Sequence, residues 1–154
     1  MNINPKAPVI TNDEIIINAP LIDIWNIHTD ISSWSDWNAE ISASKIDAPP
    51  AIGKTFSWTI GGMDIVSTIS ELIPGQKIAW SGTINGVLGI HIWLFRDMGD
   101  GVLVSTAESL EGDPVSEQVD FYQEGLDKTL RTWLENLKKK AEGINNEYSK
   151  RVSP

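Results

Sequence analysis

His91 and Glu108 are the two ionisable side chains of this sequence that could do chemistry together. A turn near residues 98–99 would join their strands into a hairpin and place His91 opposite Thr106 or Glu108. On an otherwise apolar face, two ionisable groups are costly unless they are paired. The pair is therefore a polar anchor for a ligand carbonyl or hydroxyl group, an acid–base pair, or a structural hydrogen bond that closes the core.

Aromatic side chains form the second group with potential for ligand contact. The chain has seven tryptophans but only three phenylalanines and two tyrosines. Flat rings commonly line cavities for apolar or aromatic ligands, although plain core packing is the alternative for most of them. His91 and Glu108 are the candidate catalytic residues. The candidate ligand-binding residues are Phe56, Trp58, Trp80, His91, Trp93, Thr106, Glu108 and Tyr122.

Other kinds of reaction centre have no counterpart in the sequence. The absence of cysteine excludes disulfides, thiolate metal sites and cysteine nucleophiles. The two histidines, His28 and His91, are far apart, and no carboxylate cluster with metal-ligand spacing accompanies either. No P-loop, dinucleotide fingerprint or G-x-S-x-G elbow is present. We therefore expect neither a metal nor a cofactor.

The elements that would position these side chains follow one another in a simple order. Short connections between successive strands predict an antiparallel meander. Strand patterns cover residues 14–18, 54–60, 63–72, 77–82, 87–96 and 102–110, and residues 21–37 read as two short helices. Gly61-Gly62 and Asn85-Gly86 are two-residue hairpin signals.

The C-terminal part of the chain predicts one long amphipathic helix. Asp113 is a natural N-cap, Pro114 suits the first helical position, and apolar residues then recur at helical spacing up to Leu137. From residue 113 to about 142 this helix would be roughly 45 Å long. The predicted fold is α+β, with a twisted antiparallel sheet wrapped around the helix and space for a cavity between them.

Length and composition limit the class of protein. The chain has 154 residues, 41% of them hydrophobic and 21% charged, which predicts one globular domain over 1–154 with its core at about 13–142. A net charge of −9 without a basic stripe makes nucleic acid a poor partner. The longest apolar run, residues 87–95, is too short to cross a bilayer, so we expect no integral membrane association and a cytoplasmic location.

Several short motifs resemble the polyketide cyclase/dehydrase and START-like (SRPBCC) superfamily in their order and spacing. They are Ile17-Asn18-Ala19-Pro20, Trp34-Ser35-Asp36-Trp37-Asn38, Gly53-Lys54-Thr55-Phe56-Ser57-Trp58, Glu71-Leu72-Ile73-Pro74, Ile78-Ala79-Trp80-Ser81-Gly82, His91-Ile92-Trp93-Leu94-Phe95, Glu108-Ser109-Leu110-Glu111-Gly112 and Trp133-Leu134-Glu135-Asn136-Leu137-Lys138. The resemblance implies a helix-grip fold with a hydrophobic ligand cavity. It does not imply one particular reaction.

Three functions remain open at this point. The first is binding or transport of a small hydrophobic molecule, lipid-like or polycyclic. The second is a cyclase- or dehydrase-type enzyme in which His91 and Glu108 move protons. The third is an interaction module with a closed core, because Ile90, Ile92 and Leu94 make the outer face of their strand apolar as well. Such a face is covered by a second layer, covered by the partner of a homodimer, or exposed.

Overall fold

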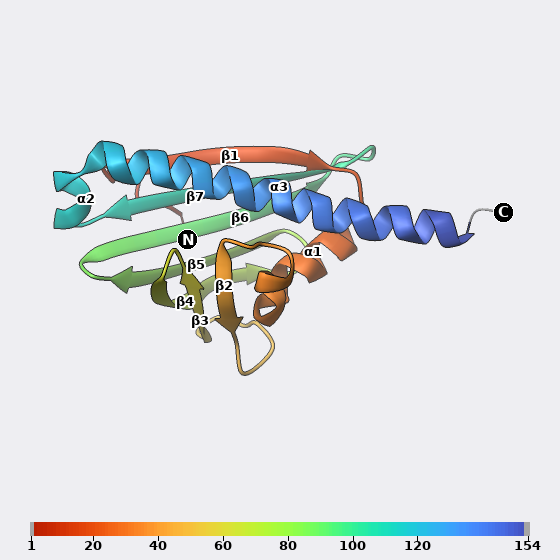
Figure 1. Cartoon of the computed structure of the whole chain (residues 1–154), viewed down its shortest axis with the longest axis horizontal. Helices are drawn as coiled ribbons and strands as arrows, with labels where there is room; N and C mark the ends of the chain where they lie inside the picture. Colours follow the sequence, from red (N-terminus) through yellow and green to blue (C-terminus); the bar gives the residue numbers. More distant parts are fainter. Residues whose placement is uncertain (1, 153–154) are drawn as a thin grey trace.

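A seven-stranded antiparallel sheet and one long helix make up most of the protein (Figure 1). The computed structural model describes the backbone of residues 2–152 and the side chains of residues 2–144. The strands are β1 (Val9–Ile17), β2 (Ile41–Lys45), β3 (Thr55–Ile60), β4 (Met63–Ile73), β5 (Lys77–Ile84), β6 (Val87–Asp97) and β7 (Val102–Glu111). Their order in the sheet is β1-β7-β6-β5-β4-β3-β2. The helices are α1 (Leu21–Thr29), the 3-10 helix η1 (Ile31–Asp36), α2 (Asp113–Glu117) and α3 (Val119–Val152).

The predicted α+β fold is confirmed, as are the meander from β3 to β7 and the two short helices after the first strand. The hairpin signal at Asn85-Gly86 is also confirmed, because both residues have positive φ angles, 50° and 81°. The strand predictions differ from the structure at two places. β1 starts at Val9 rather than at the predicted residue 14, and no strand is predicted where the structure has β2.

The predicted long C-terminal helix is confirmed as α3, but its predicted start is wrong, because α3 begins at Val119 and residues 113–117 form the separate short helix α2. Gln118 leaves the helical region with φ −139° and ψ 52° and separates α2 from α3. The apolar spacing continues across this break through Val115 and Val119, which explains why periodicity alone does not reveal it.

Helix α3 covers the free edge of the sheet at β1, as the side-by-side course of the two elements in Figure 1 shows. The side-chain amide of Gln123 accepts a hydrogen bond from the N–H of Ile10 and donates one to its carbonyl oxygen. Further along, Lys138 donates to the carbonyl oxygen of Ile16 over 2.7 Å. Helix side chains thus take the place of a neighbouring strand and protect this edge from pairing with another chain.

Aromatic rings fill most of the interior between the sheet and α3. Trp133 is the central member, since its ring centroid lies 5.2 Å from Trp34, 5.3 Å from Trp93 and 5.7 Å from Trp58. The indole N–H of Trp34 donates to the carbonyl oxygen of His28 over 2.7 Å. The expected space between helix and sheet is therefore largely closed by the tryptophans themselves.

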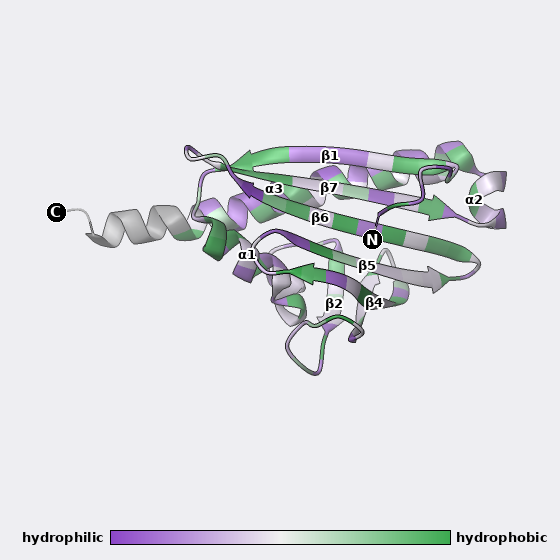
Figure 2. Ribbon diagram, turned by 180° about the vertical axis from the view of Figure 1, so that it is seen from behind, coloured by the Kyte–Doolittle hydropathy of each residue, from purple (hydrophilic) through white to green (hydrophobic). Residues whose placement is uncertain are grey.

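The outer face of β6 is partly covered by the chain's own N-terminal segment, which lies over the back of the sheet in Figure 2. The backbone N–H of Asn4 donates to Ser109 Oγ over 3.0 Å, and its side chain donates to Glu111. Leu94 is 46% exposed, whereas Ile92 on the same face is buried. Among the described helices, none combines the length and apolar character that crossing a membrane requires.

Replacing Trp133 with alanine tests the importance of this aromatic core. Trp133 is 1% exposed, and its removal should lower the free energy of unfolding by about 3–5 kcal/mol, the usual cost of deleting a large buried ring. Phe121 lies on the same helix but is 69% exposed, so Phe121→Ala is a matched control expected to stay within about 0.5 kcal/mol of the parent protein. Urea denaturation followed by circular dichroism measures both. Equal losses in the two variants would contradict a core centred on Trp133.

Candidate functional site

The β6–β7 hairpin brings His91 and Glu108 directly opposite each other. The turn is closed by a hydrogen bond from the Met98 N–H to the Gly101 carbonyl oxygen, and the register then pairs Trp93 with Thr106. Thr106 is therefore the diagonal neighbour of His91 on the same face. The expected juxtaposition of these three side chains is confirmed.

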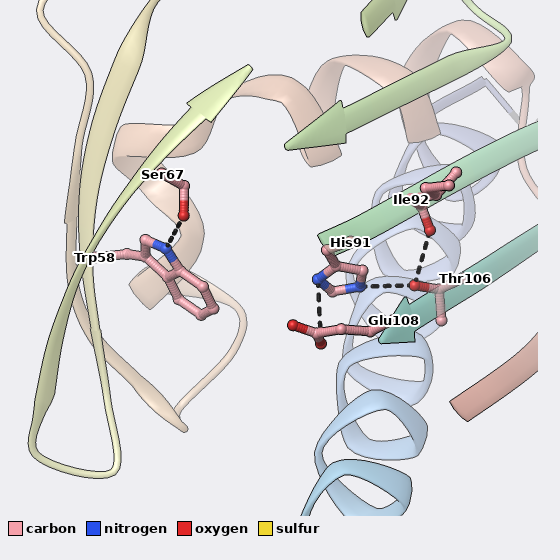
Figure 3. A network of polar contacts seen from close by, with 6 residues as sticks. All are labelled: Trp58, Ser67, His91, Ile92, Thr106 and Glu108. Carbon is pink, nitrogen blue, oxygen red and sulfur yellow. Dashed lines mark hydrogen bonds and ion pairs between the residues drawn. The ribbon is translucent and has the colours of Figure 1, made fainter. Parts of the chain in front are cut away.

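A chain of polar contacts starts at the His91 ring (Figure 3). His91 Nε2 lies 2.8 Å from Thr106 Oγ1, and the Thr106 hydroxyl donates to the carbonyl oxygen of Ile92 over 3.2 Å. On the other side of the ring, His91 Nδ1 lies 3.5 Å from Glu108 Oε2. Because the only proton of the Thr106 hydroxyl goes to Ile92, Thr106 Oγ1 accepts from His91 Nε2–H. Nδ1 then presents its lone pair to Glu108.

Burial keeps this pair electrically neutral. It lowers the pKa of the His91 ring well below its ordinary value of 6.5, and the nearby His28 lowers that pKa further. Burial also raises the pKa of the Glu108 carboxyl from 4.5 to about 8. At neutral pH Glu108 is therefore mainly protonated and the His91 ring is neutral, so the 3.5 Å contact joins a carboxylic acid to an imidazole rather than two ions.

Glu108 also borders a pocket on the concave face of the sheet. The pocket has a volume of about 70 Å³, and a water molecule needs about 10–15 Å³ of such space. It therefore has room for the edge of a ring or the end of a chain. Apolar side chains dominate its wall, which consists of Trp58, Ile65, Ser67, Trp80, Gly82, Ile84, Val87, Gly89, Glu108 and Leu110.

Two glycines paired across β5 and β6 leave the backbone bare at this pocket. Gly82 and Gly89 are partners in the register, and both belong to the pocket wall. A Cβ atom on Gly82 would lie 2.6 Å from the carbonyl oxygen of Val66, so only glycine fits there. A Cβ atom on Gly89 would come within 3.3 Å of Glu108 Oε1 and would occupy space beside the carboxyl group.

The structure separates the sequence-predicted ligand-binding residues into three groups. Trp58, Trp80 and Glu108 line the pocket. His91 and Thr106 lie behind Glu108, and both are buried. The other three are away from the pocket wall: Phe56 and Trp93 are packed in the core, and Tyr122 is half-buried on α3.

Ser67 and His28 were not among the predicted site residues. Ser67 accepts a hydrogen bond from the indole N–H of Trp58 over 3.1 Å and so orients one wall of the pocket. Its polar side chain between the inward-facing Ile65 and Ile69 was a signal that the sequence offered. The ring of His28 is fully buried 4.5 Å from that of Trp93, and neither of its nitrogens has a hydrogen-bond partner in the described part of the chain. Burial lowers the pKa of His28 to about 3.

A second hollow, of about 390 Å³, lies on the outer face of β1, β7 and β6. Its wall consists of Asn12, Asp13, Glu14, Ile92, Leu94, Ser105, Thr106 and Ala107. This larger groove lacks an aromatic wall and the His91–Glu108 pair, so the smaller inner pocket is the better candidate site. The described residues include no group of three or more potential metal ligands.

Comparison with known proteins places this chain in a family. A family model described as "polyketide cyclase / dehydrase and lipid transport" matches residues 9–142. The chain belongs to this family, whose members have the START-like helix-grip fold. No curated protein matches the chain.

Solved structures with the same fold differ widely in their descriptions. A hypothetical protein from Helicobacter pylori superimposes with a TM-score of 0.80 at 18% identity, covering 90% of this chain and 91% of that one. A START superfamily protein from Mycobacterium smegmatis has a TM-score of 0.75 at 16% identity, covering 88% and 98%. The di-domain aromatase/cyclase StfQ of steffimycin biosynthesis has a TM-score of 0.76 at 13% identity, covering 90% of this chain and 52% of that one. At these identities the likeness concerns the fold.

The stability of the Glu108→Gln variant relative to the parent protein should increase as the pH rises. The native carboxyl keeps its proton up to a pH of about 8, whereas an ordinary carboxyl releases it near 4.5. Between these two pH values the folded state holds a proton that the unfolded state has already released. Because of this one group, the free energy of unfolding of the parent protein falls by at most about 1.4 kcal/mol for each pH unit. Glutamine does not titrate. Urea denaturation at intervals from pH 4.5 to 9 should show a difference that grows up to pH 8 and then levels off. A constant difference would contradict the raised pKa.

Proposed function

We propose that this protein binds a small hydrophobic ligand in the inner pocket, with Glu108 as the polar contact. The observation that carries this proposal is the composition of the pocket wall: two tryptophan rings and several aliphatic side chains surround one carboxyl group. Small-molecule sites combine a mainly apolar wall with a few placed polar groups in this way. Membership of a family described by lipid transport as well as cyclase activity supports the same conclusion.

The volume of the pocket limits how much of the ligand it holds. Sites for drug-sized ligands typically measure 300–1,000 Å³, whereas this pocket measures about 70 Å³. The edge of a six-membered ring, or the end of a longer apolar molecule, suits this space, because a cavity that encloses a whole benzene ring measures about 150 Å³. A polycyclic ligand would leave its other rings outside or displace one of the tryptophans.

A proton-transferring enzyme is the second candidate, because the Glu108 carboxyl contacts both the pocket and the His91 ring. A pKa of about 8 allows this carboxyl to donate and recover a proton near neutral pH. An enzyme of this kind would exchange protons for deuterium at the carbon next to the carbonyl group of a bound ligand, and a binding protein would not. The exchange should be lost in Glu108→Gln while binding persists.

Filling the pocket should abolish ligand binding. Gly89→Val adds three carbon atoms beside Glu108, and a panel of neutral one- and two-ring aromatic compounds should then bind at least tenfold more weakly. Binding is followed by NMR through the indole N–H signal of Trp58, a pocket residue, and by the rise in melting temperature. Ala107→Val on the outer face of the sheet is the matched control and should bind like the parent protein.

A second blocking variant, Ile84→Trp, guards against misfolding of Gly89→Val, because Ile84 lies elsewhere on the pocket wall. The proposal is wrong if no compound in the panel moves the Trp58 signal or the melting temperature. It is equally wrong if both blocking variants fold and bind as the parent protein does.

A further inference from the structure

We infer that the ligand of this pocket presents a hydrogen-bond donor, a hydroxyl or N–H group, to Glu108, and that carbonyl compounds without such a donor are disfavoured. The inference rests on the proposed function and names the polar group of the ligand. It follows from the direction of the hydrogen bonds behind the pocket, and Figure 3 shows the residues that make these contacts.

The direction of these hydrogen bonds is set at Ile92, the residue of the series that is farthest from the pocket. The carbonyl oxygen of Ile92 can only accept, and Thr106 Oγ1 donates its single proton to it over 3.2 Å. If that proton turned toward His91 instead, two oxygen atoms would face each other at this distance with no proton between them. Thr106 Oγ1 is therefore the acceptor in its 2.8 Å contact with His91 Nε2.

The same direction continues through the histidine ring. With the ring proton on Nε2, Nδ1 has only a lone pair to offer, and it lies 3.5 Å from Glu108 Oε2. A carboxyl proton on Oε2 would point at this lone pair, whereas a proton on Oε1 would leave two lone pairs facing each other across this contact. We therefore assign any carboxyl proton to Oε2, which leaves the second carboxyl oxygen, Oε1, as an acceptor.

Oε1 is the oxygen that the ligand meets. It lies beside the bare backbone of Gly89, 3.3 Å from the position that a Cβ atom would take there, and Gly89 belongs to the pocket wall. In Figure 3 the Glu108 oxygen without a dashed line points away from His91 toward the side of Trp58. No hydrogen bond to Oε1 from another described side chain is present, and the Glu108 side chain is 14% exposed. A ligand donor would complete the chain, whereas a ligand carbonyl would place two acceptors against each other.

Matched pairs of small ring compounds test this inference. Cyclohexanol and cyclohexanone have almost the same size, but only the alcohol has a donor; phenol and anisole form the second pair. Dissociation constants come from NMR titration of the Trp58 indole N–H signal in the full chain. We expect each donor compound to bind about tenfold or more tightly than its partner, because the partner compound leaves the buried acceptor Oε1 without a donor.

Variants of Thr106 test the proposed origin of the selectivity. Thr106→Val removes the acceptor of the Nε2 proton, so the ring can carry its proton on Nδ1 and Glu108 can turn a proton toward the pocket. The preference for donors should then fall to threefold or less. Thr106→Ser keeps the hydroxyl group and should keep the preference, which controls for packing changes at this position.

The possible results separate the inference from the proposed function. Cyclohexanone binding as tightly as cyclohexanol would overturn the inference and leave the binding function intact. A donor preference that survives in folded Thr106→Val would also overturn it. If none of the four compounds binds, the proposed function and the inference fail together.

Discussion

The hydrogen bond from the Thr106 hydroxyl to the Ile92 carbonyl oxygen determines the chemistry of the whole candidate site. A threonine hydroxyl has one proton, so this bond places the ring proton of His91 on Nε2 and turns the lone pair of Nδ1 toward Glu108 Oε2. The buried polar groups are costly unless each donor meets an acceptor, and a chain that ends on a backbone carbonyl satisfies this condition. At the pocket end of this series of contacts, Glu108 Oε1 has no hydrogen-bond donor among the described side chains.

The aromatic interior explains why the pocket is small. Trp133 from α3 meets Trp34, Trp58 and Trp93, so the helix closes on the sheet through rings rather than around an open cavity. The side chains of α3 also occupy the free edge at β1, which holds the helix in register with the sheet. What stays open is the region where Gly82 and Gly89 carry no side chain. The size and shape of any ligand therefore depend on two glycines as much as on the tryptophans.

Much of this arrangement could be predicted from the sequence, because short hairpins and strict alternation determine which side chains share a face. The short turn at residues 97–101 predicts that His91 lies opposite Thr106 or Glu108, and the structure pairs it with Glu108. Strand β2 is missed in this way, since its alternation covers only five residues with one large apolar side chain, Ile41, and the strand packs against η1. The break at Gln118 was hidden by an apolar stripe that crosses it. The direction of the hydrogen bonds depends on a backbone carbonyl, Ile92, which no side-chain pattern reveals.

The protonation state of the His91 ring tests the central claim most directly. Long-range nitrogen–proton NMR correlation of the nitrogen-15-labelled protein distinguishes a protonated Nε2 from a protonated Nδ1 by the nitrogen chemical shifts. We expect a neutral His91 ring with its proton on Nε2 throughout pH 5.5 to 8, because burial holds its pKa well below 6.5 and Thr106 accepts the Nε2 proton. A ring protonated on Nδ1 alone, or on both nitrogens at pH 7, would contradict the direction of the hydrogen-bond chain and the acceptor character of Glu108 Oε1 with it.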